Sequence, residues 1–552
     1  MTIRIESSDW LKNAAIAGFM RILDLPATHP HYLEFDQEDL ADFEQKYFQY
    51  FRDTYTPFTS WNKIVEQHSW LHSLAVSQMT EKDLTKLNEI IELTKTKLTS
   101  NSYVNTYPLI SELTIDIKDL GEKLKKITKQ KRETVLDIQM DIQKVREQLL
   151  TIIDILNQPQ VKKYITTRNV IYDVITHFWS SVSFLHVKAN VKDMFEIYHD
   201  YFLVPLHQFI QEQKDQKKYE KYKYQCSTCN NKIASITSAF DLTWIVKTGV
   251  DGTRKSSHYW NYRSDMYVCP VCNFLYSCVP AGFIYFKGKG LFVNESSTIK
   301  TLLSVNQVSL QKVKNFEELE EKSYYQILNT LDQAQIEKMS KEIQNIQIVK
   351  LDKENTVRPY TFNILSKERL DVMMNNKKRI EKLVGKYVKT DEGFINLYEE
   401  VTTRIYQNRN QFDLLYKLLV LGRKSDFSNT HAMYLILLIS NSSEKGGKRM
   451  DYRKINEFQR MGIQLQIAYK DTPNKLPGIT HRLLNATKVK NEHRFTETLL
   501  NAYMSKGKKV PLEFIESLHD QSRFQTIAYA FLLGLQGGNE KKSNDKEDKE
   551  NE

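Results

Sequence analysis

Long apolar runs are missing from this chain of 552 residues. The apolar stretch Tyr434–Ile439 is far shorter than the ~18–20 residues that a membrane-spanning helix needs. The N-terminal residues carry charges at Arg4, Glu6 and Asp9 and lack the apolar segment of a signal peptide. We therefore expect a protein that is neither inserted into a membrane nor exported.

Cysteine is also scarce, with five residues in the whole chain. Four of them fall into two Cys-x-x-Cys pairs. Two disulfides would require an oxidising compartment, whereas paired thiols in a metal pattern fit a reducing one. The cysteine content therefore predicts a cytoplasmic protein.

Motifs for catalysis are absent as well. The sequence has no nucleophile elbow, no helicase motif and no His-Glu-x-x-His. His519 and Asp520 form a lone pair, and a metal-dependent phosphohydrolase would need further His and Asp partners that the sequence does not place. We predict that the chain is not an enzyme, with a metal-dependent nuclease using His519 as the less favoured alternative.

The two Cys-x-x-Cys pairs are the most informative feature that is present. Each pair can offer two thiolates to one ion, and two pairs complete the four-sulfur shell of a closed structural zinc site. The alternatives are a redox dithiol and an iron–sulfur centre. The predicted Zn²⁺ ligands are Cys226, Cys229, Cys269 and Cys272.

The residues around the pairs fit such a site. Asn230 and Asn273 follow the two pairs, and asparagine tolerates the left-handed backbone that a knuckle turn often needs. Pro270 presets one dihedral angle inside the second pair. The remaining cysteine, Cys278, lies in an apolar run, and we expect a buried thiol there.

The charge balance points to an anionic partner. The formal net charge is +10 and the pI about 8.9, with 30 tyrosines and 26 phenylalanines. Lysine and arginine can hold phosphates while aromatic rings stack on bases. The alternative is an AT-biased genome, which enriches lysine, tyrosine, asparagine and isoleucine without any such function.

Two segments are candidates for nucleic-acid contact. Lys287 and Lys289 belong to a Gly-flanked loop between two predicted strands, and Asn294 follows the second apolar run. Lys or Asn can read base edges in a groove. An ordinary hairpin turn explains the loop equally well. A second, basic segment predicts contact with the phosphates of a displaced strand. Its candidate residues are Lys445, Lys448, Arg449 and Arg453.

The hydrophobic pattern predicts an α+β fold. Residues 8–24 follow a helical face that Ser8 or Asp9 can cap, with Gly18 as a close-packing position. Residues 111–156 show an a/d seam that predicts one long helix or a helical hairpin. Strand-like runs flank the 287–290 loop, and residues from about 393 to 535 read as helices.

These patterns divide the chain into five parts. We predict a mixed, largely helical domain (1–210), a β-rich zinc-binding insertion (211–300), a mixed α/β connection (301–390), a helical bundle (391–538) and a disordered charged tail (539–552).

Three features together carry a resemblance to a known family. A Trp-Leu-x-Asn-Ala helix with a following Gly, residues 10–18, precedes the two cysteine pairs, and the helical C-terminal part contains Asn491–Phe495. The chain thereby resembles the CRISPR-associated CXXC–CXXC family, the large subunit of type I-B Cascade complexes. The cysteine pairs and the N-terminal helix are the specific parts of this resemblance.

The resemblance implies a role in a ribonucleoprotein complex. Such a subunit binds the crRNA 5′ region, helps to read a protospacer-adjacent motif in target double-stranded DNA, and recruits the helicase-nuclease or, in transposon-associated relatives, a transposition adaptor. Other Cascade subunits are further implied partners. The C-terminal bundle resembles the small Cascade subunit, and Met373, Met374 and Met433 are candidate internal starts for it. The competing interpretation is a zinc-stabilised scaffold that touches no nucleic acid.

Overall fold

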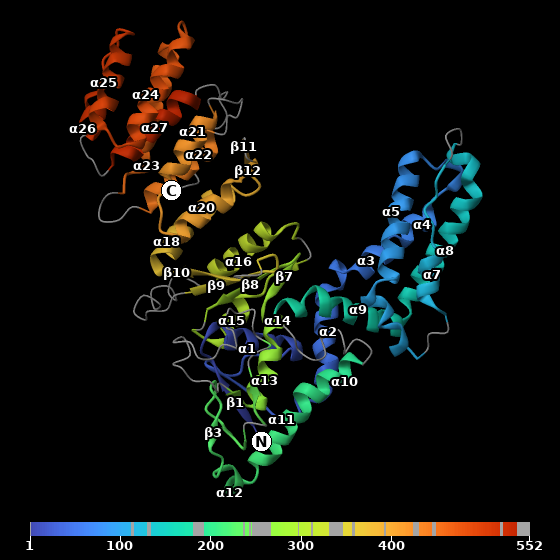
Figure 1. The fold of residues 1–552 in the computed structure, drawn as a ribbon. Coiled ribbons are helices and arrows are strands. Elements are labelled where there is room, and N and C mark those ends of the chain that lie inside the picture. Colours follow the sequence, from blue (N-terminus) through green and yellow to red (C-terminus); the bar gives the residue numbers. More distant parts are fainter. Residues whose placement is uncertain are drawn as a thin grey trace. The chain divides into compact units, whose positions relative to one another are not determined.

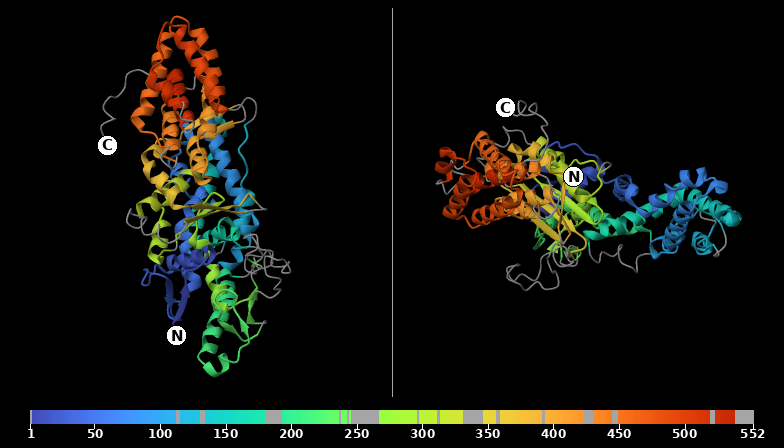
Figure 2. Two further views of the ribbon diagram at one scale, coloured as in Figure 1. Left: turned by 90° about the vertical axis from the view of Figure 1, so that its left-hand side faces the viewer. Right: turned by 90° about the horizontal axis from the view of Figure 1, so that it is seen from above.

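The computed structural model describes residues 2–111, 115–129, 134–179, 193–235, 238–241, 244, 267–295, 297–310, 313–330, 346–355, 359–390, 393–422, 430–443, 449–518 and 523–537. The chain divides into two compact units (Figures 1 and 2). We call Met1–Asp332 with Ile346–Asn363 the N-terminal unit, and Gln333–Asn345 with Ile364–Glu552 the C-terminal unit.

The N-terminal unit combines helices with small antiparallel sheets. Its helices are α1 (Trp10–Leu23), α2 (Phe43–Tyr55), α3 (Ser60–Val65), α4 (His68–Ser73), α5 (Glu81–Leu98), α6 (Asn101–Val104), α7 (Ile117–Lys123), α8 (Gln139–Asn157), α9 (Pro159–Asp173), α10 (Met194–Tyr198), α11 (Val204–Gln213), α12 (Gln216–Tyr219), α13 (Pro270–Ser277), α14 (Val279–Gly282), α15 (Ile299–Val305) and α16 (Phe316–Thr330). Its strands are β1 (Ile3–Glu6), β2 (Tyr32–Phe35), β3 (Tyr224–Gln225), β4 (Lys232–Ile233), β5 (Phe240–Asp241), β6 (Tyr267–Val268), β7 (Ile284–Phe286), β8 (Lys289–Asn294) and β9 (Ile346–Asp352), with β10 (Tyr360–Leu365) at the boundary.

Helix α1 contributes many of its residues to the main core. The Asp9 carboxylate accepts hydrogen bonds from the Leu11 and Lys12 backbone N–H groups, at 2.9 and 3.1 Å, and so caps the helix. Gly18 lets α1 approach α14 closely: a methyl group at Gly18 would lie 2.0 Å from the Cys278 carbonyl oxygen. The predicted capped helix with a close-packing glycine is confirmed.

A second hydrophobic cluster lies around α3, α5, α7 and α8, and α9 contributes residues to both clusters. Of the two alternatives for residues 111–156, the single long helix is wrong and the helical hairpin is the one that fits, because α7 and α8 are separate helices that contact each other. The stretch between them is irregular at Leu124 and Ile127, both buried. The Asn88 side chain explains this, since its amide bonds both the N–H (2.9 Å) and the C=O (3.0 Å) of Ile127, which then needs no helical partner.

The largest sheet has the strand order β10-β9-β8-β7. Strands β7 and β8 form an antiparallel hairpin with Phe286 opposite Lys289, so Lys287 and Gly288 make its two-residue turn. Both turn residues have positive φ, 46° at Lys287 and 90° at Gly288, as tight hairpin turns require. The predicted pair of strands is confirmed, and its loop is a hairpin turn.

The C-terminal unit is built mainly of helices. They are α18 (Lys367–Asn375), α19 (Lys377–Glu381), α20 (Leu397–Tyr406), α21 (Phe412–Gly422), α22 (Thr430–Ser442), α23 (Tyr452–Ala468), α24 (Leu476–Lys488), α25 (Glu492–Met504), α26 (Leu512–Leu518) and α27 (Phe524–Gly537), with one hairpin of β11 (Tyr387–Thr390) and β12 (Gly393–Asn396). Helices α23 and α27 pack through Gly462 and Gly534, whose added methyl groups would lie 2.1 Å from the Phe531 oxygen and 1.9 Å from the Gln459 oxygen.

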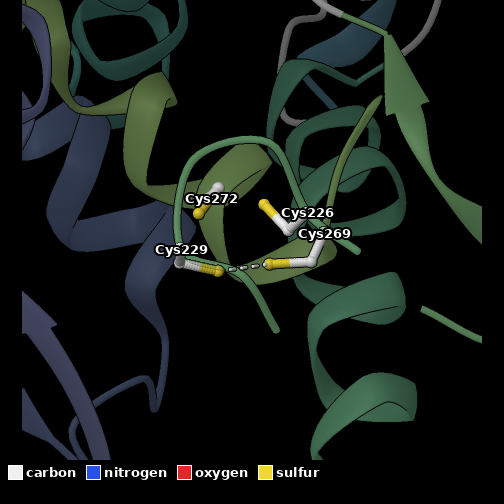
Figure 3. Close-up of side chains that lie close together, drawn as sticks. All are labelled: Cys226, Cys229, Cys269 and Cys272. Carbon is white, nitrogen blue, oxygen red and sulfur yellow. Dashed lines mark hydrogen bonds between the residues drawn. The ribbon is translucent and has the colours of Figure 1, made fainter. Parts of the chain in front are cut away.

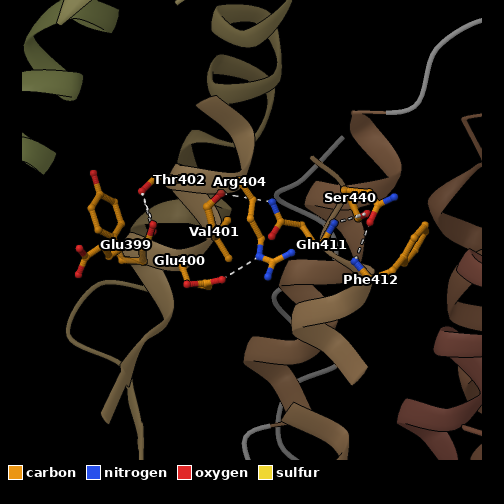
Figure 4. A network of polar contacts seen from close by, with 10 residues as sticks. Glu399, Glu400, Val401, Thr402, Arg404, Gln411, Phe412 and Ser440 are labelled. Carbon is orange, nitrogen blue, oxygen red and sulfur yellow. Dashed lines mark hydrogen bonds and ion pairs between the residues drawn. The ribbon is translucent and has the colours of Figure 1, made fainter. Parts of the chain in front are cut away.

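A polar network ties α20 to the start of α21 and to α22 (Figure 4). The Gln411 side-chain amide donates to the Val401 carbonyl oxygen at 3.2 Å, and its backbone N–H donates to Ser440 Oγ at 3.2 Å. Within α20, Arg404 Nε donates to the Glu400 carboxylate at 2.9 Å. These bonds fix the entry of the chain into the bundle.

The α+β class is therefore confirmed, with helices dominating and the sheets small and antiparallel. The finer division into five parts stays a prediction, and the charged tail 539–552 lies outside the described residues. Among the described helices, none combines the length and the apolar character of a membrane span.

Candidate metal centre

The first cysteine pair lies in the turn between β3 and β4. The Cys226 N–H donates to the Asn231 carbonyl oxygen at 2.9 Å, and the Asn230 N–H returns to the Cys226 carbonyl oxygen at 3.0 Å. Asn230 has φ of 60°, the left-handed conformation predicted for it. This tight turn points both thiols to the same side (Figure 3).

The second pair lies at the start of helix α13. Cys269 is its N-cap residue and Pro270 occupies the first turn, where a missing N–H costs nothing. Asn273 is helical here, so the expected left-handed turn at this position is wrong. The Asn273 side chain instead accepts a hydrogen bond from Trp244 Nε1 at 3.1 Å.

The four sulfur atoms converge on one point (Figure 3). All lie within 4.8 Å of one another, and Cys229 Sγ is 3.5 Å from Cys269 Sγ. Tetrahedral zinc with Zn–S bonds of ~2.3 Å separates its sulfurs by roughly 3.8 Å. None of the four cysteines forms a disulfide. The donor set and its spacing therefore fit one tetrahedrally bound ion such as Zn²⁺.

Burial makes this a closed site. Cys226, Cys269 and Cys272 are at most 1% exposed, and Cys229 is partly buried. A centre with four protein ligands and no solvent-facing position holds shape rather than activating a substrate. Its chemistry is to cross-link the β3–β4 turn to helix α13.

The four thiols influence one another strongly. Hydrogen bonds from Cys229, Cys269 and Cys272 lower the pKa of Cys226, and hydrogen bonds to Cys226 and Cys229 raise the pKa of Cys269 and of Cys272. Four thiolates this close together would repel one another, and a bound cation would compensate their charge.

The metal centre belongs to the main core of the N-terminal unit. Cys226, Cys269 and Cys272 lie in the same buried cluster as the residues of α1 and α2. Cys278, between α13 and α14, is fully buried as predicted, and burial raises the pKa of its thiol. The two knuckles are also joined directly, since the Ser227 N–H and Oγ both donate to the Tyr267 carbonyl oxygen, at 2.9 and 3.0 Å.

Sequence reasoning missed these supporting contacts. Trp244 and Tyr267 flank residues 245–266, and nothing in their spacing reveals that one will reach Asn273 and the other Ser227.

Residues 219–284 match the model of a family described as CRISPR-associated protein (Cas_CXXC_CXXC). The match contains both cysteine pairs together with α13 and α14. The chain thus carries a CRISPR-associated CXXC–CXXC domain around its candidate metal centre. Neither the curated proteins nor the solved structures contain a match to this chain.

The three hairpin candidates for nucleic-acid contact have different surroundings. Lys287 is exposed at the turn, and Lys289 lies 3.9 Å from the Asp352 carboxylate. Asn294 is 8% exposed: its Oδ1 accepts from Asn13 Nδ2 at 2.8 Å and its amide donates to Gln347 at 3.0 Å. Both polar groups of Asn294 therefore already have partners inside the protein.

The second group of candidates is only partly described. Arg449 and Arg453 are exposed, and Lys445 and Lys448 lie outside the described residues. Burial, together with nearby Arg449, lowers the pKa of Arg379, so cationic groups do gather there. His519 and Asp520 also lie outside the described residues, and a catalytic role for them stays untested.

Proposed function

We propose that this protein is the large subunit of a type I-B CRISPR Cascade complex. In this role it binds the crRNA 5′ region and target double-stranded DNA in the cytoplasm, contributes to recognition of a protospacer-adjacent motif, and recruits a helicase-nuclease or a transposition adaptor. The observation that carries the proposal is the CRISPR-associated family match over residues 219–284, which coincides with the four-sulfur cluster.

The proposed role is structural and binding, not catalytic. The closed thiolate shell offers no coordination position to a substrate, which supports a platform rather than an enzyme. Bound Zn²⁺ supplies a fixed point, and the chain's own residues supply the contacts to nucleic acid.

Within the β7–β8 hairpin, we propose that Lys287 and Lys289 make the duplex contact. Asn294 then has a supporting role, because its side-chain amide bonds both Asn13 of α1 and Gln347 of β9. The exposed Arg449 and Arg453 are the proposed contacts to the phosphates of a displaced strand.

The experiment is co-expression with the other subunits and a crRNA, followed by purification through another subunit. We expect this chain in the complex and duplex binding whose logarithm falls linearly with the logarithm of salt concentration. Lys289→Ala should weaken duplex binding and reduce the salt slope by about 1.

The competing function is a metal-stabilised scaffold. The cysteine cluster itself favours the scaffold, because it belongs to the main core and a metal there would stabilise the fold whether or not nucleic acid is bound. A salt slope near zero for duplex binding, or binding that is unchanged when this chain is left out, would favour the scaffold.

A further inference from the structure

A pocket of about 320 Å³ opens in the N-terminal unit beside the tip of the β7–β8 hairpin. Four lysines from separate segments line it, and we call it the lysine pocket: Lys63 on α3, Lys97 at the end of α5, Lys287 at the hairpin turn and Lys353 after β9. The sequence gives no indication of this group, because only the fold brings the four segments together.

The hairpin turn places two of these lysines on the same rim. The Lys353 N–H donates to the Gly288 carbonyl oxygen at 2.9 Å, so the chain leaving β9 is held against the turn. Gly288 has φ of 90°, and a side chain there would both strain the backbone and contact Lys353. The rim position of Lys287 and Lys353 is therefore set by backbone geometry.

The positive charge of the lysine pocket is only partly balanced by the residues that line it. In the part of the chain that the structure describes, none of the four lysines forms an ion pair. The one carboxylate in the lining is Asp173. The Asp173 side chain is exposed in the pocket. Desolvation by the surrounding protein raises its pKa, and the positive charges of Lys97, Lys353 and Lys63 lower it by a smaller amount. An anionic ligand would relieve this excess of positive charge.

An exposed aromatic ring adds a second recognition element. Phe58 lines the pocket and is 39% exposed, with its ring packed edge-on against Phe286 at 5.6 Å between centroids. Behind it, Tyr285 is fixed by its hydroxyl bond to His177 Nδ1 and by the bond from its N–H to Tyr55 Oη. A partly exposed aromatic ring next to cations suits a nucleobase attached to a phosphate.

The size of the pocket restricts the ligand. Its volume lies at the lower end of the range for small-molecule sites, about 300–1,000 Å³, which leaves room for one nucleotide and excludes a duplex. We propose that the lysine pocket binds one unpaired nucleotide of a nucleic-acid strand, with its phosphate among Lys63, Lys97 and Lys353 and its base against Phe58. The Lys287 ammonium donates to the Lys314 carbonyl oxygen at 3.4 Å and stays with the proposed duplex contact. Asp173 would accept a hydrogen bond from a base amino group or a ribose hydroxyl. This inference rests on the proposed function and names a ligand class within it.

The test uses the full chain, purified with its metal, and short single-stranded RNA and DNA of the same mixed sequence carrying a fluorescent label. Binding is followed by fluorescence anisotropy over a series of salt concentrations. Phe58→Ala should weaken binding about 10-fold by removing the stacking surface, and Phe58→Trp should restore it. Lys97→Ala and Lys353→Ala should each weaken binding about 5-fold and reduce the salt slope by about 0.7.

The matched control is Lys82→Ala, which removes an exposed lysine from the same helix as Lys97 but outside the pocket. If Phe58→Ala, Lys97→Ala and Lys353→Ala bind both strands as well as Lys82→Ala does, the proposal is wrong. Thermal unfolding of each variant shows whether the fold is intact.

A labelled nucleoside 5′-monophosphate separates the two sources of the ligand. We expect it to bind in the same pocket, more weakly than the oligonucleotides, because a strand has neighbouring phosphates. If the monophosphate binds as tightly as the oligonucleotides or more tightly, the ligand is a free nucleotide and the proposal of a nucleic-acid strand is wrong. If the pocket variants lose nucleic-acid binding but the chain does not assemble with the other Cascade subunits, the proposed function is wrong and this inference stands. If the chain assembles but the pocket variants bind as well as the control, this inference alone is wrong.

Discussion

Two helix pairs, one in each unit, pack through glycines in the same way but differ in how far apart the paired helices lie in the sequence. The α1–α14 pair in the N-terminal unit and the α23–α27 pair in the C-terminal unit both use two glycines whose missing side chains let the backbones touch. The first pair joins segments far apart in the sequence, and α14 directly follows the metal helix α13. The second pair joins nearby segments, and no candidate metal cluster occurs among the described residues of its unit.

The difference indicates where a bound ion would be useful. Closing a longer loop costs more conformational entropy, and the contact between α1 and α14 must bear that cost. An ion that cross-links α13 would supply a fixed platform for α14. The α23–α27 contact closes a shorter loop, the one that contains α24, α25 and α26, so less of that cost arises in the bundle.

Metal removal should produce the largest difference between the two units. Structural zinc contributes on the order of 10 kcal/mol in small domains, comparable to the whole stability of a domain. We expect chelation, or Cys272→Ser, to abolish the protection of α13 and α14 in hydrogen exchange followed by mass spectrometry while α27 keeps its protection. Metal content is measured in parallel.

Cys278→Ala is the control for this prediction, since its thiol is buried but does not belong to the cluster. This variant should retain one equivalent of metal. Equal protection of α13 with and without metal would contradict the assigned role.

Glycine substitutions should give the next largest effect and affect both units. Gly18→Ala and Gly462→Ala each force a methyl group to about 2 Å from a backbone oxygen, so the helices must separate, at a cost of roughly 3 kcal/mol. Only Gly18→Ala should also lower metal retention in a competition with a chelator, because it displaces α14.

The matched control is Gly478→Ala in α24, where an added methyl group meets nothing within 4 Å. It should stabilise the protein by about 0.5–1 kcal/mol in denaturant unfolding. A loss of stability comparable to that of Gly462→Ala would show that close packing is not the cause.

Arg21 offers a smaller, local test of the α1–α14 contact. Its guanidinium donates to the carbonyl oxygens of Ala281 (3.0 Å), Gly282 (2.8 Å) and Asn306 (2.6 Å). Arg21→Met should lower the free energy of unfolding by about 2 kcal/mol, because these acceptors lose their donor. Arg21→Lys should recover only part of it, since an ammonium cannot reproduce the planar fork. Full recovery by lysine would indicate that charge alone matters.

Gln411 should give the smallest effect. Its side chain makes one hydrogen bond to Val401, while its Oε1 is buried without a partner among the described residues. Gln411→Leu removes this hydrogen bond but also removes the buried, unpaired oxygen. The two effects oppose each other, so we expect the free energy of unfolding, measured with denaturant, to change by less than about 1 kcal/mol. A larger loss would reveal a role for the network of Figure 4 in holding α20.

The sequence predicted the parts of this protein that depend on local chemistry. Asp9 as a cap, Gly18 as a close contact, Asn230 in a left-handed turn and the cluster of four cysteines that could hold a metal ion all follow from residue type and spacing. The C-terminal helices are equally visible in their periodicity.

Predictions failed where a distant partner decides the conformation. Ile127 continues a helical pattern but is taken out of the helix by the side chain of Asn88. Asn273 resembles a turn residue but lies in α13 and bonds Trp244. The lysine pocket was missed for the same reason, because its lysines are neighbours only in three dimensions.

The long separation between α1 and α14 has a consequence for synthesis. At ribosomal rates of about 5–20 residues per second, the helix that begins at Trp10 waits roughly 15–50 seconds before the chain around Gly282 is made. During this interval α1 can already pack against β2 and α2, but the face that receives α13 and α14 has no partner, and this exposed apolar face would make the nascent chain a client for chaperones. Truncated products that stop before Pro270 would stay in that state.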